Sequence, residues 1–262
     1  MYTSILDTHL HLYPCFDLPL AFNQFLDNTA RLGGTQTSRV ACLAERFDCN
    51  YYQSIAAGDI RLDGFTTDKV LEDEVTLTRE RDKLSLSLLP GRQIISREKI
   101  EILALGCPQS LEDGQPALDV IYQIIQLGHV PVLPWSPGKW FGARGELIKR
   151  LISELGAGDF LIGDTPLRPY GWAIPRLMKL AKQKGFSVVA GSDPLPFSGE
   201  EHWLGAYCTV AQSKEKLTAN ELLHALKNQQ QGVQWDNSGK RTHVLPLFNR
   251  LRKNAASKKR PA

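Results

Sequence analysis

Long hydrophobic runs are missing from this chain of 262 residues. The longest stretch without Asp, Glu, Lys or Arg, residues 120–138, contains three prolines, two glycines, two glutamines and a histidine. Such a stretch is too polar and too often interrupted to cross a bilayer as a helix. The first seven residues hold no Lys or Arg and lead into no apolar segment of signal-peptide length. We therefore expect a cytoplasmic protein without a membrane partner.

Cysteine is also scarce, and its spacing forms no recognisable pattern. The chain has an odd number of cysteines and no Cys-x-x-Cys pair, which excludes both a disulfide framework and a zinc ribbon. We expect reduced, buried thiols at Cys15, Cys42, Cys49, Cys107 and Cys208. The composition, 42% hydrophobic and 23% charged, excludes a disordered, collagen-like or coiled-coil chain.

Acidic residues are absent from one end of the chain. Residues 240–262 carry eight basic side chains and no acid, so the rest holds 23 basic and 28 acidic residues, a balance of −5. We expect a basic C-terminal helix or tail over residues 240–262, with residues 245–251 docked as a last helix. Nucleic acid binding through this tail is an unlikely alternative, because no aromatic residue is interleaved with its final charges.

Short segments rich in β-branched residues alternate with longer segments of helical period, a pattern typical of a repeating βα domain. Strands are predicted at residues 4–12, 39–44, 75–78, 83–89, 99–105, 130–134, 159–162 and 186–190. Helices are predicted at residues 18–32, 111–127, 144–155, 174–184 and 219–229.

Residues 84–96 and 99–105 look like adjacent strands joined by a polar turn at residues 96–98. The strands between residues 75 and 105 thus follow one another without a helix, which indicates a β-rich insertion. We expect one α/β domain over residues 1–239, a TIM-type (β/α) barrel of seven or eight strands, either regular or distorted. An open doubly wound sheet is the alternative, but no Gly-rich loop follows the first strand.

Two histidines lie at the end of the first predicted strand. Alternation along this strand places Asp7, His9 and His11 on one face. Two neighbouring imidazoles can chelate one ion, and active sites gather at the carboxyl ends of barrel strands. The alternative is that both histidines are satisfied by hydrogen bonds in a polar environment.

A carboxylate follows a later buried strand, in the sequence Gly191-Ser192-Asp193. We expect Asp193 at the same rim as the two histidines, where it could bind the ion or act as the catalytic base. Its alternative role is to cap the turn that leads into the following loop.

Both motifs resemble those of metal-dependent hydrolase barrels, namely the amidohydrolase superfamily and the PHP (polymerase and histidinol phosphatase) phosphoesterases. Residues 89–96 and 101–106 look like a characteristic PHP stretch, and residues 221–227 look like the helix that closes such domains. The resemblance implies a metal-dependent hydrolase, and it carries His9, His11 and Asp193 over as functional residues.

The chain also departs from the PHP pattern. Gln93, Trp135 and Leu195 stand where that pattern has a metal-binding Glu and two histidines. We therefore expect one divalent metal ion (zinc, manganese or iron) rather than a multinuclear site. Further candidate ligands near predicted strand ends or in the loop after Asp193 are Glu45, Asp164 and His202.

Two further segments after predicted strands combine cations with aromatic rings, which suits binding of an anionic group. The candidate substrate-binding residues are Trp135, Lys139, Arg144 and Arg168. The leading hypothesis is a metal-dependent hydrolase that uses metal-activated water on a small anionic substrate, with a phosphoester as the first candidate. The alternative, motivated by the departures at positions 93, 135 and 195, is a degenerate barrel that binds a ligand or serves as a scaffold.

Overall fold

The computed structural model describes residues 1–34, 37–71 and 73–257, so the last residues of the predicted basic tail, 258–262, lie outside the described residues. The strands are β1 (Tyr2–Leu10), β2 (Ser38–Leu43), β3 (Phe65–Leu71), β4 (Glu74–Arg79), β5 (Ser85–Leu89), β6 (Gly91–Ile95), β7 (Glu101–Leu105), β8 (Val130–Pro134), β9 (Leu161–Asp164), β10 (Val188–Ala190), β11 (Tyr207–Ser213) and β12 (Val233–Gly239). The α-helices are α1 (Leu18–Ala30), α2 (Tyr51–Ala57), α3 (Ala117–Gln126), α4 (Gly142–Glu154), α5 (Arg176–Gln183), α6 (Ala219–Lys227) and α7 (Val244–Ser257).

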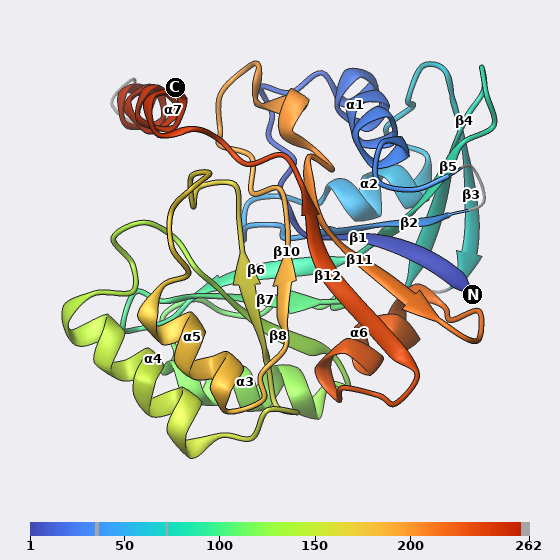
Figure 1. Ribbon diagram of the computed structural model, residues 1–262. Coiled ribbons are helices and arrows are strands. Elements are labelled where there is room, and N and C mark those ends of the chain that lie inside the picture. Colours follow the sequence, from blue (N-terminus) through green and yellow to red (C-terminus); the bar gives the residue numbers. More distant parts are fainter. Residues whose placement is uncertain (35–36, 72, 258–262) are drawn as a thin grey trace.

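The strands form two mixed sheets (Figure 1). One has seven strands in the order β12-β11-β1-β2-β5-β4-β3, and the other has five in the order β10-β9-β8-β7-β6. The α/β class is as expected, but the predicted TIM-type barrel is wrong. A TIM barrel requires parallel strands joined by helices, whereas β11 pairs antiparallel with both β1 and β12, and β7 with both β6 and β8. Over the described residues the strands therefore make two sheets instead of one closed ring.

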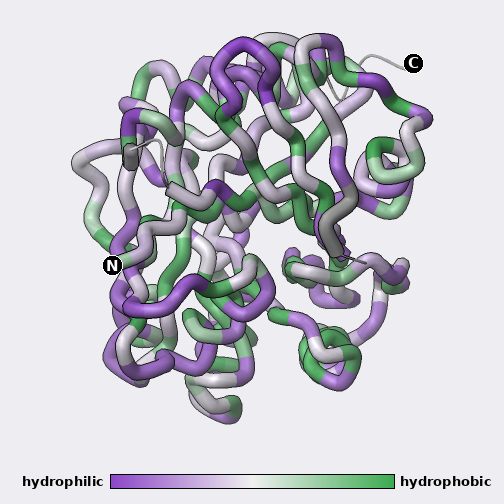
Figure 2. Tube along the Cα trace, turned by 90° about the vertical axis from the view of Figure 1, so that its right-hand side faces the viewer, coloured by the Kyte–Doolittle hydropathy of each residue, from purple (hydrophilic) through white to green (hydrophobic). Residues whose placement is uncertain are grey.

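Three groups of buried apolar side chains hold the two sheets and their helices together. Helices α3, α4 and α5 pack on the five-stranded sheet around Phe160, and α1 and α2 pack on the seven-stranded sheet around Phe22. A third group lies between the sheets, where Leu6 and Leu103 belong to the same cluster as Leu226 of α6. In Figure 2 the interior strands are largely hydrophobic, while hydrophilic segments lie mainly in the outer turns.

Backbone hydrogen bonds join the two sheets at two places. The N–H of Asp193, just after β10, donates to the carbonyl oxygen of His9 at 2.8 Å. The N–H of Glu45, just after β2, donates to the carbonyl of Gly91 in β6 at 3.0 Å. Gly191 permits the first contact, because a Cβ there would lie 2.3 Å from the backbone nitrogen of His9. The carboxyl ends of β1 and β10 are thus held against each other.

Helix α6 lies at the opposite end of these strands, where the hydroxyl of Ser187, before β10, donates to the carbonyl of Leu226 at 2.6 Å. Helix α7 covers and extends the predicted last helix. It is fastened to the body by a buried ion pair between Arg250 and Glu200, at 2.6 Å, and by the buried side chain of Leu247. No described helix is both long and apolar enough to cross a membrane.

The five cysteines are free thiols, as expected, although Cys15 is exposed rather than buried.

Candidate metal centre

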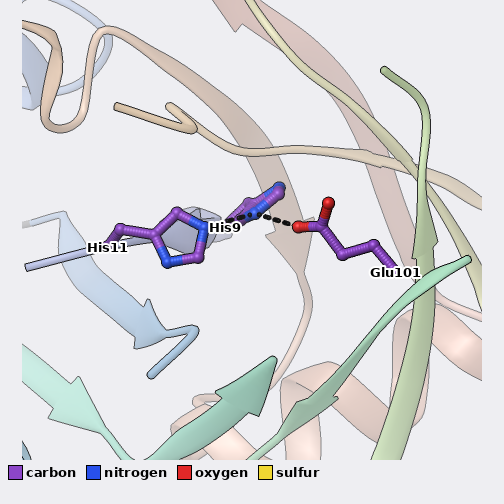
Figure 3. Close-up of side chains that lie close together, drawn as sticks. All are labelled: His9, His11 and Glu101. Carbon is purple, nitrogen blue, oxygen red and sulfur yellow. Dashed lines mark hydrogen bonds and ion pairs between the residues drawn. The ribbon is translucent and has the colours of Figure 1, made fainter. Parts of the chain in front are cut away.

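Three side chains converge on one buried point between the two sheets (Figure 3). The Nε2 atoms of His9 and His11 lie 2.9 Å apart, and Nε2 of His9 lies 3.3 Å from Oε1 of Glu101. One ligand atom from each residue lies within 4.8 Å of the others. All three residues are at most 6% exposed. Two imidazole nitrogens and a carboxylate oxygen therefore face one another away from bulk water.

Asp193 adds a second carboxylate to this cluster. Its Oδ1 lies 3.7 Å from Nε2 of His9 and 4.0 Å from Nε2 of His11. The backbone of Asp193 adopts a left-handed conformation, with φ of 42°, and its N–H is held by the carbonyl of His9. The structure thus brings together the three residues that the sequence motifs singled out, namely His9, His11 and Asp193.

Asp7, the first residue of the histidine motif, has a different role. Its carboxylate is fully buried and accepts backbone hydrogen bonds from His9 at 3.2 Å, Ser192 at 2.8 Å and Gly205 at 3.0 Å. These bonds tie β1 to the turn after β10 and to the segment before β11. Asp7 therefore positions the strand that carries the histidines.

Sequence reasoning missed Glu101 because it searched for ligands at the carboxyl ends of strands. Strand β7 runs antiparallel to β8, with Leu103 opposite Val132, so its first residue lies at the end where β8 finishes. Gln93, the residue aligned with the metal-binding Glu of the PHP pattern, lies on β6 opposite Leu103. The available signal was an acid at the start of an otherwise apolar strand, since buried charges are rare unless they are paired or ligate metals.

Lys139 reaches the cluster from the loop after β8 and donates a hydrogen bond to Oε2 of Glu101. Its side chain is 39% exposed, so it also faces solvent. This lysine was predicted to bind an anionic substrate, and in the structure it lies at the edge of the cluster beside one of its carboxylates.

Burial and neighbouring charges shift the pKa values of the four groups in the cluster. The pKa values of His9 and Asp193 are raised, and those of His11 and Glu101 are lowered. Burial and the neighbouring charge of His9 lower the pKa of His11 to about 3. Burial also lowers the pKa of His9, but the charges of Asp193 and Glu101 outweigh burial and raise it above its ordinary value. Burial disfavours ionisation of Glu101, yet the hydrogen bond from His9 and the charge of Lys139 hold its pKa below its usual range. Burial raises the pKa of Asp193.

The donor set fits one divalent metal ion. Imidazole nitrogens and carboxylate oxygens are the ligands that zinc, manganese and iron take in proteins. Among the described residues, Nδ1 of His9 and Nδ1 of His11 have no hydrogen-bond partner. Without a metal, one of the two facing Nε2 atoms must carry a proton, because two lone pairs would repel each other. A cation would instead bind the lone pairs of both Nε2 atoms and the carboxylate oxygen of Glu101 together. The protein therefore holds a buried polar cluster that its own hydrogen bonds leave incompletely satisfied.

Glu45, a predicted ligand, lies outside the cluster of His9, His11 and Glu101. Its carboxylate accepts a hydrogen bond from the backbone N–H of Tyr52 at 3.0 Å and lies 3.5 Å from the guanidinium of Arg92. These contacts fasten the start of α2 to β6.

Asp164 and Arg168 are engaged with each other. The guanidinium of Arg168 donates to both carboxylate oxygens of Asp164, at 2.8 and 2.5 Å, and the hydroxyl of Tyr207 donates to the second oxygen at 3.0 Å. Arg168 also donates to the carbonyl of Trp172 at 3.0 Å. The structure thus places the predicted ligand Asp164 and the predicted substrate-binding residue Arg168 in one buried ion pair.

The remaining candidates do not join the cluster of His9, His11 and Glu101. Trp135 is 4% exposed and contacts the ring of Trp172 edge to face, with centroids 6.5 Å apart. Arg144 donates to the carbonyl of Gly138 at 2.9 Å. His202 is exposed on a short 3-10 helix, Glu200–Trp203.

No protein-family model and no curated protein sequence matches this chain. Solved structures match it at low sequence identity. PsfC from Pseudomonas syringae PB-5123 shares 15% identity with a TM-score of 0.60, and the match covers 99% of both chains.

The lesion-specific endonuclease PfuEndoQ from Pyrococcus furiosus shares 12% identity with a TM-score of 0.55, over 90% of this chain and 59% of that one. Endonuclease Q in complex with a 27-mer duplex substrate, with an abasic lesion at its active site, shares 10% identity with a TM-score of 0.53, over 92% and 60%. The chain thus spans about three fifths of these endonuclease chains. At such identities the matches show a shared fold.

Proposed function

We propose that this protein is a metal-dependent hydrolase that cleaves a phosphoester bond in an anionic substrate. The observation that carries the proposal is the convergence of His9, His11 and Glu101 on one buried point, with Nε2 atoms 2.9 Å apart. These residues would hold one divalent ion. When bound, such an ion lowers the pKa of water and stabilises negative charge on a phosphoryl oxygen.

Asp193 is the residue best placed to accept a proton from the attacking water. Its carboxylate faces both imidazoles at 3.7 and 4.0 Å. Among the described residues no hydrogen bond occupies that carboxylate, so an oxygen is available to a water molecule in the cluster. The role of Asp193 in this proposal is the general base.

Lys139 is placed to bind the anionic part of the substrate. Its ammonium group contacts Glu101 at the edge of the cluster, and 39% of its side chain remains exposed. An incoming phosphate would therefore meet a positive charge immediately beside the metal-binding carboxylate. Arg168 does not share this role, because Asp164 and the carbonyl of Trp172 engage its guanidinium.

The structural neighbours support phosphoester chemistry. A protein of this fold is described as a lesion-specific endonuclease, and an endonuclease cleaves phosphodiester bonds. Nucleic acid is therefore a candidate substrate class here, along with smaller phosphoesters.

Metal content is the direct test of the proposed site. After dialysis against zinc, manganese and iron, elemental analysis should find close to one ion per chain in the wild type and almost none in His9→Ala/His11→Ala. His202→Ala is the matched control, because its imidazole is exposed and outside the cluster, and it should retain the ion. Metal-free wild type, or equal metal in the double variant, contradicts the proposal.

A second candidate function is ligand binding without turnover. The ion pair of Lys139 with Glu101 favours it, because the ammonium group neutralises one of the cluster's carboxylates. The departures from the PHP pattern at Gln93, Trp135 and Leu195 favour it as well. Metal-loaded protein that binds inorganic phosphate but hydrolyses neither phosphomonoesters nor phosphodiesters would select this function.

A further inference from the structure

Two loops beside the metal cluster expose aromatic side chains to solvent. The loop after β8 carries Phe141, which is 66% exposed, and the loop after β9 carries Trp172, which is 55% exposed. Large aromatic rings are usually buried at least in part, and those that gather on a surface mark a binding site more often than single exposed residues do.

Phe141 lines a cavity between α4 and α5, two helices that lie side by side in Figure 1. Its volume of about 600 Å³ lies in the range of small-molecule binding sites. Trp135, Trp140 and Phe141 line it, and the ring of Trp135 contacts that of Trp172. We call these four residues the aromatic shelf.

Positive charges accompany the shelf. Lys149, Arg176 and Lys179 line the same cavity, and Glu146 is its one acidic lining residue. Glu146 lies 3.9 Å from the ammonium group of Lys149. Within the part of the chain that the structure describes, Arg176 and Lys179 form no ion pair. The cavity therefore has a surplus of positive charge that suits an anionic ligand.

The loop after β8 carries residues of the shelf and a residue that contacts the cluster. Trp135 and Phe141 lie on either side of Lys139 in the sequence, and Lys139 contacts Glu101 of the cluster. Trp135 is only 4% exposed, so the rings open to a ligand with a phosphate at Lys139 are those of Phe141 and Trp172.

We propose that the two exposed rings of the aromatic shelf, Phe141 and Trp172, stack against a planar heteroaromatic group of the substrate, so that the substrate is a nucleobase-bearing phosphoester. The free nucleotide and the end of a single nucleic acid strand share this chemistry. A nucleobase fits better than an aliphatic chain, because exposed rings flanked by cations favour stacking of a flat group attached to an anion. The phosphoester half of this inference rests on the proposed function; the stacking half does not.

The test compares two ligands that differ by the base alone. Dissociation constants for adenosine 5′-monophosphate and ribose 5-phosphate are measured by calorimetry for wild type, Phe141→Ala and Trp172→Ala. We expect the nucleotide to bind wild type about tenfold more tightly, a typical stacking effect. Each variant should reduce that preference while leaving ribose 5-phosphate binding unchanged. Tyr122→Ala, an exposed aromatic of α3, is the control and should keep the preference. Equal binding of the two ligands to wild type, or an unchanged preference in both variants, overturns the proposal.

Two further measurements distinguish the free nucleotide from the end of a nucleic acid strand, and the stacking proposal from the proposed hydrolase function. A six-nucleotide single strand is compared with the mononucleotide. If the strand binds more tightly and with a steep salt dependence, the ligand is the end of a strand. If it binds equally or more weakly, the ligand is the free nucleotide. In His9→Ala/His11→Ala the preference for the base should persist, because the shelf lies outside the cluster. A base preference without any hydrolysis by metal-loaded wild type refutes the hydrolase and keeps the shelf, whereas hydrolysis without a base preference refutes only the shelf.

Discussion

Two buried polar groups lie at the same end of the molecule and differ in how completely their atoms are paired. Asp164 receives hydrogen bonds from Arg168 and Tyr207, so both of its carboxylate oxygens are engaged. In the other group the Nε2 atoms of His9 and His11 face each other, and neither Nδ1 atom has a partner among the described residues. We call the first the closed pair and the second, with Glu101 and Asp193, the open cluster.

The two groups are connected through the turn after β10. The N–H of Gly191 donates to the carbonyl of Asp164 at 3.1 Å, and the N–H of Asp193 donates to the carbonyl of His9 at 2.8 Å. Buried polar groups are normally satisfied, and those that are not often have a functional reason. The closed pair therefore holds the turn in place, and the open cluster keeps its ligand atoms available for an ion and a substrate.

The largest expected effect is on catalysis in the open cluster. Asp193→Asn should lower the rate of phosphoester hydrolysis by about 10² to 10⁴-fold, the contribution of a general base. Asparagine tolerates the left-handed backbone at this position, so the fold should be preserved. Steady-state kinetics with a chromogenic phosphodiester, together with metal analysis, checks this. Asp119→Asn on α3 is the exposed control. A variant with the wild-type rate would assign the base elsewhere.

The next prediction changes the closed pair, where we expect an effect on stability and none on metal binding. Arg168→Ala leaves the carboxylate of Asp164 buried without its cation, and removing one partner of a buried ion pair costs about 3–5 kcal/mol of unfolding free energy. Urea denaturation measures the loss, and metal content per folded molecule should not change. Arg144→Ala, which removes one hydrogen bond to Gly138 at the surface, should cost less than about 1.5 kcal/mol. If Arg168→Ala costs no more than this control, the closed pair does not stabilise the fold.

A change within the ligand set should be somewhat smaller. Glu101→Gln keeps the shape of the side chain but removes its charge. We expect metal affinity to fall by at least about 100-fold, because removing the charge of a ligand should cost no less than removing a group that only orients a ligand. Metal at about 100 times its dissociation constant should stabilise the wild type by about 2.7 kcal/mol. The same concentration should stabilise the variant by much less. Thermal unfolding with and without metal tests this, with Glu146→Gln as the control. Equal stabilisation of both proteins would exclude Glu101 as a ligand.

The sequence was sufficient for the part of the open cluster that depends on local motifs. His9 lies in β1, His11 comes one residue after the end of β1, and Asp193 comes three residues after the end of β10, so their positions required only strand prediction. Glu101 required knowledge that β7 pairs antiparallel with β8, which brings the first residue of β7 to the end where β8 finishes. Asp164 looked equally suitable as a ligand, because the sequence does not show that Arg168 and Tyr207 engage its oxygens.

The helices and strands also separate into those that local sequence predicts and those that depend on pairing with distant segments. Strands such as β8 and helices such as α6 were predicted from hydrophobic period, which is a local property. Strands β3, β11 and β12 and helix α2 were missed; β12, for example, contains Asp, Asn, Ser and Gly, which disfavour strands unless a partner such as β11 pairs with them. The barrel prediction failed because closure depends on pairing between distant strands, and antiparallel neighbours direct these strands into two sheets.

The smallest predicted effect tests whether Lys139 belongs to the open cluster as a substrate contact or only as a partner of Glu101. Lys139→Met keeps a long side chain without the charge, so the carboxylate of Glu101 becomes more available to a divalent ion. A partly exposed ion pair contributes about 0.2–1 kcal/mol, so metal affinity should rise by a factor of about five or less. The affinity of the metal-loaded protein for inorganic phosphate should fall, because the cation that meets the anion is gone. Calorimetric titrations with metal and then with phosphate measure the two changes separately. Tighter metal binding together with weaker phosphate binding is expected only if Lys139 competes with the metal for Glu101 and also contacts the substrate. Tighter metal binding with unchanged phosphate affinity would mean that the lysine only balances the charge of Glu101.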